Sequence, residues 1–230
     1  MDSVRKAPAQ RFDLSAFMAP APARVRVMNF TSGNEAIHTR LQWPEQRSLL
    51  GNGDVALVID APQDYLEEKD GADCILFIDP KHCSRDLGQR GYQIVPALHS
   101  TTSTFSIWAE QRVGYLCAVI LGNDWPGKNY ATFRHFLAGC TSHHLRVEVV
   151  DIDSGSPLPL WQLPTYGFKN LYVLYVKNQW PDLREVTEFT DAIEELSPHL
   201  NELVLSVALG VNPSARAILI GEPDLLPYTT

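Results

Sequence analysis

Short apolar runs with alternating polar positions recur along most of this 230-residue chain. Alternation with a period of two is typical of half-buried strands, and turn-forming Gly, Pro, Asn and Asp bound most of these runs. The pattern predicts ten strands, at residues 25–28, 54–60, 74–79, 92–98, 104–109, 114–121, 145–153, 171–177, 203–209 and 215–220.

Three other segments repeat their apolar residues at helical spacing. The pattern predicts helices at residues 32–41, 128–138 and 183–196. The last helix is the clearest, because its apolar residues form one stripe and Asp182 can cap its first turn. We expect Phe189, at the centre of this stripe, to be buried against a sheet.

The lengths of the connections favour antiparallel pairing. Only about a dozen residues separate the strands predicted at 54–60, 74–79 and 92–98, and a parallel crossover usually contains a full helix. The strands at 104–109 and 114–121 are close enough to form a hairpin. We therefore expect a mainly β fold, a two-sheet antiparallel sandwich of the jelly-roll type with about three short helices in its loops.

Two local features affect this fold assignment. Pro96 lies inside the predicted strand 92–98, and proline is confined to sheet edges, strand ends or bulges. The helix at 183–196 lies between two strands, which is the order of a β-α-β unit. An α+β fold with a mixed sheet therefore stays open as the alternative.

Composition indicates one folded domain with a separate N-terminal segment. Hydrophobic residues make up 45% of the chain and charged residues 20%, which is typical of globular domains. Prolines break residues 1–24 into an extended Ala/Pro arm. We expect this arm to pack on another chain. We also expect residues 25–221 to form a single β-rich domain and residues 222–230 to form a short tail.

The charge distribution argues against nucleic-acid binding by the body of the protein. The net charge is −8, and the first 26 residues carry +3, which leaves −11 for the rest. Phosphate backbones are bound by clustered Lys and Arg, so we expect any nucleic-acid contact only through the arm. No apolar run is long enough to cross a membrane, and the first residues lack the apolar stretch of a secretory signal.

Asp151 and Asp153 are the most suggestive candidates for chemistry. Carboxylates two residues apart lie on the same face of a strand and can share a divalent cation. The segment VVDIDSG resembles the first motif of haloacid-dehalogenase-like phosphotransferases, in which the first Asp is the nucleophile and the second a general acid/base. The Ser-Gly-Ser that follows departs from that motif. We therefore favour the interpretation that the strand runs into a solvent-exposed turn at these residues.

A second group of candidate metal ligands is Cys140, His143 and His144. Their spacing is short, but a closed zinc site usually takes four ligands in two pairs, and no second pair has that spacing. His82 and Cys83 complete the group only if the fold brings them close. We expect no metal and no cofactor.

Two further acidic residues, Asp60 and Asp79, each end an apolar strand. In an open parallel sheet such carboxylates gather at the carboxyl edge and mark a site, whereas in an antiparallel sandwich they start turns. The preferred fold favours turns.

A loop that mixes aromatic and turn residues supplies the candidate binding residues Trp125, Lys128 and Tyr130.

The sequence contains no G-x-G-x-x-G, Walker, G-x-S-x-G or H-E-x-x-H motif, so we expect a structural protein and not an enzyme. A sandwich with an extended arm is typical of jelly-roll virion subunits. We expect a capsid protein that assembles with copies of itself or sister subunits, in a virion or the host cytoplasm. Two alternatives stay open: a metal-dependent hydrolase or phosphotransferase using Asp151 and Asp153, and a ligand- or carbohydrate-binding β-sandwich.

Overall fold

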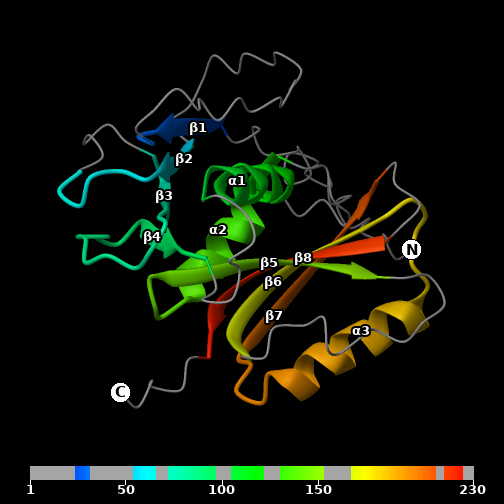
Figure 1. The fold of residues 1–230 in the computed structure, drawn as a ribbon. Helices are drawn as coiled ribbons and strands as arrows, with labels where there is room; N and C mark the ends of the chain where they lie inside the picture. The colour runs from blue at the N-terminus through cyan, green and yellow to red at the C-terminus, as the bar shows by residue number, and fades with distance from the viewer. Residues whose placement is uncertain are drawn as a thin grey trace, which may run out of the picture.

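A single mixed sheet forms the centre of the computed structural model, which describes residues 24–31, 54–65, 72–96, 105–121, 130–152, 167–210 and 215–224 (Figure 1). The described strands form one eight-stranded sheet in the order β1-β2-β3-β4-β5-β8-β6-β7. The strands are β1 (Arg24–Asn29), β2 (Asp54–Ile59), β3 (Cys74–Ile78), β4 (Gly91–Ile94), β5 (His144–Ile152), β6 (Phe168–Lys177), β7 (Glu202–Leu209) and β8 (Ala215–Pro223). The described helices are α1 (Phe105–Leu121), α2 (Tyr130–Gly139) and α3 (Leu183–Leu196).

The first five strands are parallel, which makes the expected antiparallel pairing wrong. The connection from β3 to β4, residues 79–90, contains no helix. An extended chain advances about 3.3 Å per residue, so these twelve residues can return along a strand of five. A short extended segment therefore replaces the helix that a parallel crossover usually contains.

The second part of the sheet contains strands of both directions. β8 is antiparallel to β5 and to β6, between which it lies, whereas β7 is parallel to β6. β6, α3 and β7 thus form the β-α-β unit that the order of elements had left open. The two-sheet jelly-roll sandwich is wrong, and the mixed sheet of the alternative is what the structure shows.

The hairpin predicted at 104–109 and 114–121 is also wrong, because both segments belong to the single helix α1. Short apolar runs satisfy a strand pattern and a buried-helix pattern equally well. Over the whole segment the buried positions follow helical spacing: Trp108, Ala109, Val113, Leu116, Cys117, Val119 and Ile120. No Pro, Asn or Asp stands between the two runs to make a hairpin turn.

The remaining predicted elements are present, apart from the helix at 32–41, which lies outside the described residues. The helix predicted at 128–138 is α2, and Asp182 caps α3 by accepting a hydrogen bond from the Glu185 amide at 2.7 Å. β4 lies between β3 and β5 and ends at Ile94. Pro96 therefore follows a central strand and does not mark an edge.

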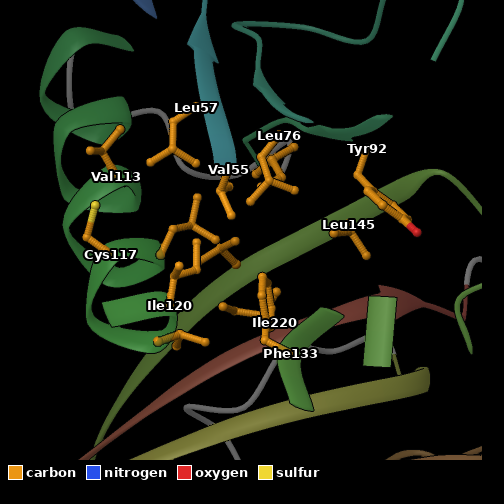
Figure 2. Close-up of a cluster of buried hydrophobic side chains, with 14 of the residues drawn as sticks. Val55, Leu57, Leu76, Tyr92, Val113, Cys117, Ile120, Phe133, Leu145 and Ile220 are labelled. Atoms are coloured by element: carbon orange, nitrogen blue, oxygen red, sulfur yellow. The ribbon is translucent and has the colours of Figure 1, made fainter. Parts of the chain in front are cut away.

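Each face of the sheet has its own apolar core. Figure 2 shows α1 residues such as Val113 and Ile120 packed toward Leu57 and Leu76 on one face. On the other face of the second half, Phe189 and Ile193 of α3 pack on β6 and β8, so α1 and α3 lie on opposite sides (Figure 1). The burial predicted for Phe189 is confirmed, since it is 3% exposed.

The two ends of the chain are described only in part. Residues 1–23 of the predicted arm and residues 225–230 of the predicted tail lie outside the described residues. Glu222 belongs to β8, is buried and accepts hydrogen bonds from the Thr141 and Ser142 amides at 3.1 and 2.8 Å. The domain boundaries otherwise stay a prediction.

Candidate functional site

The described segments that follow β3 and β4 pack on opposite faces of the sheet. Leu87, in the connection after β3, packs with Val58 and Phe77 on one face. Helix α1, which follows β4, packs on Leu57 and Leu76 of the opposite face. In parallel sheets a ligand crevice forms at the carboxyl ends of the two strands where the connections diverge in this way. The candidate site is therefore at the carboxyl end of β3.

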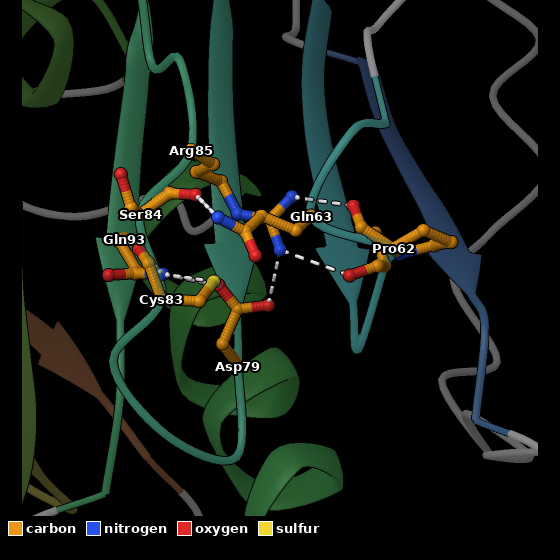
Figure 3. A network of polar contacts seen from close by, with 8 residues as sticks. Pro62, Gln63, Asp79, Cys83, Ser84, Arg85 and Gln93 are labelled. Carbon is orange, nitrogen blue, oxygen red and sulfur yellow. Dashed lines mark hydrogen bonds and ion pairs between the residues drawn. The ribbon is translucent and has the colours of Figure 1, made fainter.

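Asp79, the residue directly after β3, is buried at the centre of a polar network (Figure 3). Its carboxylate pairs with the Arg85 guanidinium, with Nη2 to Oδ1 at 2.9 Å. Its other oxygen accepts a hydrogen bond from the Gln93 amide at 2.6 Å and a weaker one from the Cys83 thiol at 3.5 Å. Both oxygens of this buried carboxylate are thus satisfied.

Arg85 also joins the β3–β4 connection to the segment after β2. Its guanidinium donates to the carbonyl oxygens of Ala61 at 3.1 Å and Pro62 at 3.3 Å, and lies 4.3 Å from the ring centroid of Phe77. Gln63 adds a hydrogen bond from its side-chain amide to the Ser84 carbonyl (Figure 3). These contacts fix the two segments side by side at the carboxyl edge.

Two polar atoms of this network are buried and lack a partner within the described structure: Arg85 Nε and Gln93 Oε1. Buried polar atoms are paired in most native structures, and exceptions often mark places where water or a ligand binds. Among its described atoms, the network thus has one buried donor and one buried acceptor that could bind a water molecule or a ligand.

Asp60, directly after β2, has a φ of 50°, a backbone region that non-glycine residues seldom adopt. Its amide donates to the Ile78 carbonyl at 2.9 Å, which fixes the strand end. Burial raises the pKa of its carboxyl, nearby Asp79 raises it further, and Arg85 opposes the rise. Strained residues with shifted pKa values concentrate at functional sites.

An open pocket lies beside the network, lined by Gln63, Asp64, Ser84, Arg85 and Asp86. Asp64, Asp86 and Ser84 are exposed, whereas the Arg85 side chain is buried against Asp79. The charge of Arg85 is therefore offset within the protein, and the lining presents two carboxylates, an amide and a hydroxyl.

The fold brings His82 next to His144, which is the proximity that a metal site with these residues would need. Their Nε2 atoms lie 3.2 Å apart and their ring centroids 4.3 Å apart. His144 begins β5 opposite Gln93 of β4, so it lies beside the Asp79 network. Burial lowers the pKa of His144, and the nearby His82, His143 and Arg146 lower it further.

The other residues of that predicted group do not join the pair. His143 Nδ1 lies 2.7 Å from the Gly91 carbonyl oxygen, and its ring lies 5.4 Å from that of Tyr92. Burial, with Glu222 and Glu202, raises the pKa of Cys140 to about 12, so its thiol is protonated at neutral pH. Among the described residues no three His, Cys, Asp or Glu side chains form a metal-binding group.

Asp151 lies on β5 opposite Arg216 of β8, and its Oδ1 accepts a hydrogen bond from Arg216 Nε at 2.7 Å. Its partner in the predicted motif, Asp153, lies outside the described residues, as do Trp125 and Lys128. Tyr130 begins α2 and is half-buried. Asp151 thus makes an exposed ion pair across two strands.

We expect Asp151→Asn to change the free energy of unfolding by less than about 1 kcal/mol, because the Asp151 side chain is 63% exposed and surface ion pairs contribute little. Chemical denaturation of the variant measures this change. A loss of several kcal/mol would show that Asp151 has a structural role that its exposure does not indicate.

Asp60 and Asp79 could be predicted from the sequence as site residues of a parallel sheet, whereas Arg85 and Gln93 were not among the candidates. Gln93 carried one signal, since it is a polar residue inside an apolar strand. Arg85 carried none, because its role depends on contacts with segments more than 20 residues away.

No family model matches the sequence, and no curated protein sequence matches it. Among solved structures, the FtsZ W319Y mutant of M. jannaschii has a TM-score of 0.45 at 12% identity, over 73% of this chain and 55% of that one. CetZ from Methanosaeta thermophila has a TM-score of 0.42 at 12% identity, over 76% and 53%. The FtsZ dimer of M. jannaschii has a TM-score of 0.43 at 10% identity, over 73% of this chain and 53% of that one. This chain therefore spans about half the length of each of these proteins.

The capsid hypothesis is wrong, because it depended on a jelly-roll sandwich and the chain forms a mixed sheet. The expected location in a virion has no support in this fold. The alternative of a ligand-binding β-sandwich is wrong for the same reason, because the chain does not form a sandwich. The hydrolase alternative has no support, because Asp151 is paired with Arg216.

Three other expectations have different outcomes. No described helix is long and apolar enough to cross a membrane. The fold and these likenesses do not confirm the expectation that the chain is not an enzyme. Assembly with further copies stays a prediction.

Proposed function

We propose that this chain binds a small cationic molecule in the pocket at the carboxyl end of β3. The observation that carries the proposal is the divergence of the connections after β3 and β4, with an acidic pocket at that end of the sheet. Ligands of α/β sheets bind at such points because the diverging segments leave a crevice that backbone and side-chain groups line.

The charge of the pocket selects the class of ligand. Asp64 and Asp86 are exposed in the lining, and Arg85, the basic residue among the described lining residues, is already paired with Asp79. An ammonium group gains two carboxylate partners here, whereas a phosphate or carboxylate would be repelled. The proposal includes binding and no chemical step, since Asp79 and Arg85 are engaged with each other.

The test is a thermal-shift screen, followed by calorimetry, with spermidine, putrescine and glucosamine as cationic probes and glucose and phosphate as comparisons. We expect at least one cationic probe to raise the melting temperature of the wild type, and neither comparison to do so. Asp64→Asn should abolish the shift, because it removes one carboxylate of the pocket.

Asp191→Asn is the matched control, since Asp191 is an exposed acid on α3 away from the pocket. It should leave binding of the cationic probe unchanged. The proposal is wrong if no cationic probe binds, or if Asp64→Asn and the wild type bind the probe equally well.

A further inference from the structure

The Nε2 atoms of His82 and His144 lie at the separation expected for two ligands of one metal ion. Zinc binds imidazole nitrogens at about 2.0–2.1 Å, and a tetrahedral angle then places the two nitrogens about 3.3 Å apart. The two Nε2 atoms here are 3.2 Å apart. We infer that His82 and His144 bind one Zn²⁺ ion through their Nε2 atoms.

The surroundings hold the backbone at both histidines in place before any ion binds. The His144 amide donates to the Ser142 hydroxyl at 3.1 Å, and β5 pairs with β4 at this position. The segment that carries His82 is held on one side by Asp79, which is fixed by Arg85, and on the other by Cys83, whose carbonyl accepts from Gln93 at 3.3 Å. Ligands on such supported segments lose little freedom on binding.

Exposure leaves room for the rest of the coordination shell. His82 is exposed and His144 is half-buried, so the ion would lie at the surface with its remaining positions open to water. In a chelate the ring centroids are somewhat farther apart than the 4.3 Å found here, and the exposed His82 side chain can turn outward to reach that separation. Imidazole is a good ligand for zinc and poor for magnesium or calcium.

This inference does not depend on the proposed function. The histidines lie over β4 and β5, whereas the acidic pocket is lined by Gln63, Asp64, Ser84, Arg85 and Asp86. The two sites share only the connection between β3 and β4. Each can therefore fail without the other.

The experiment is calorimetric titration of the untagged full chain with Zn²⁺ in a non-chelating buffer under reducing conditions. We expect saturable binding of one ion and a higher melting temperature with zinc than without it. His82→Gln should weaken binding more than about tenfold, since a lost ligand costs at least as much as a lost outer-shell partner. His135→Gln is the matched control, because His135 is exposed on α2 and should not alter binding.

His144→Gln should give the same loss as His82→Gln, and the exposed position of His82 keeps the test valid if the β5 variant folds poorly. The inference is wrong if the wild type shows no saturable zinc binding, which would leave the pair as a simple hydrogen bond. It is also wrong if His82→Gln binds as tightly as the wild type, or if Cys83→Ser alone abolishes binding while His82→Gln retains it.

Discussion

Replacing Asp79 with asparagine is expected to lower the free energy of unfolding by about 3–5 kcal/mol, as measured by urea denaturation. The side chains of Asp79 and Arg85 are only 3% and 2% exposed. Without the carboxylate, the guanidinium keeps its hydrogen bonds to Ala61 and Pro62 but becomes an unpaired buried charge. Removing one partner of a buried pair is costly because the remaining charge has lost its water and its counter-ion.

A double variant separates the cost of an unpaired charge from the value of the pair itself. Asp79→Leu with Arg85→Met replaces both charges by apolar groups, and we expect it to be more stable than Asp79→Asn. Equal losses in the two variants would show that packing, and not charge, determines the effect. A change below about 1 kcal/mol in Asp79→Asn would mean that water reaches Arg85 in solution, contrary to its burial.

The positions of the strands were predictable from sequence because alternation and turn residues are local signals. All the predicted strands except those at 104–109 and 114–121 are present as strands. The strand prediction for those two segments was wrong because α1 contacts apolar groups along much of its surface. It therefore lacks the polar face that distinguishes a helix from successive strands.

The direction of pairing was not predictable from the same signals. A connection of about a dozen residues allows either an antiparallel turn or an extended return, and residues 79–90 take the second course by packing Leu87 on the sheet. This one difference changes the interpretation of Asp60 and Asp79. In a sandwich they would begin turns, whereas in the parallel half they lie at one edge, where Arg85 pairs with Asp79 and its charge acts on Asp60.

The composition of the candidate site depended on tertiary contacts that spacing cannot show. His144 was a candidate because of its neighbours Cys140 and His143, but the fold turns all three toward different partners. The partner of His144 is His82, which is 62 residues away in the chain. A list of candidate residues was therefore partly available from sequence, but their grouping required the sheet order.

Phe189→Ala is expected to lower the free energy of unfolding by about 3–5 kcal/mol. Phe189 lies at the centre of the apolar stripe of α3, and its ring meets that of Tyr175 edge to face at 5.4 Å. Truncation removes the aromatic contact and leaves a cavity between the helix and β6 that the sheet is too rigid to fill.

Glu188→Ala on the same helix is the matched control for this prediction. Glu188 is 58% exposed and pairs with Arg184 one turn away, so its loss should cost under about 0.5 kcal/mol. Urea denaturation of both variants compares neighbouring positions that differ mainly in burial. If Phe189→Ala left the midpoint unchanged while Glu188→Ala lowered it sharply, α3 would have to present its other face to the sheet. The β-α-β unit of β6, α3 and β7 would then lack the apolar contact that stabilises it, because Phe189 and Ile193 are the fully buried residues of α3.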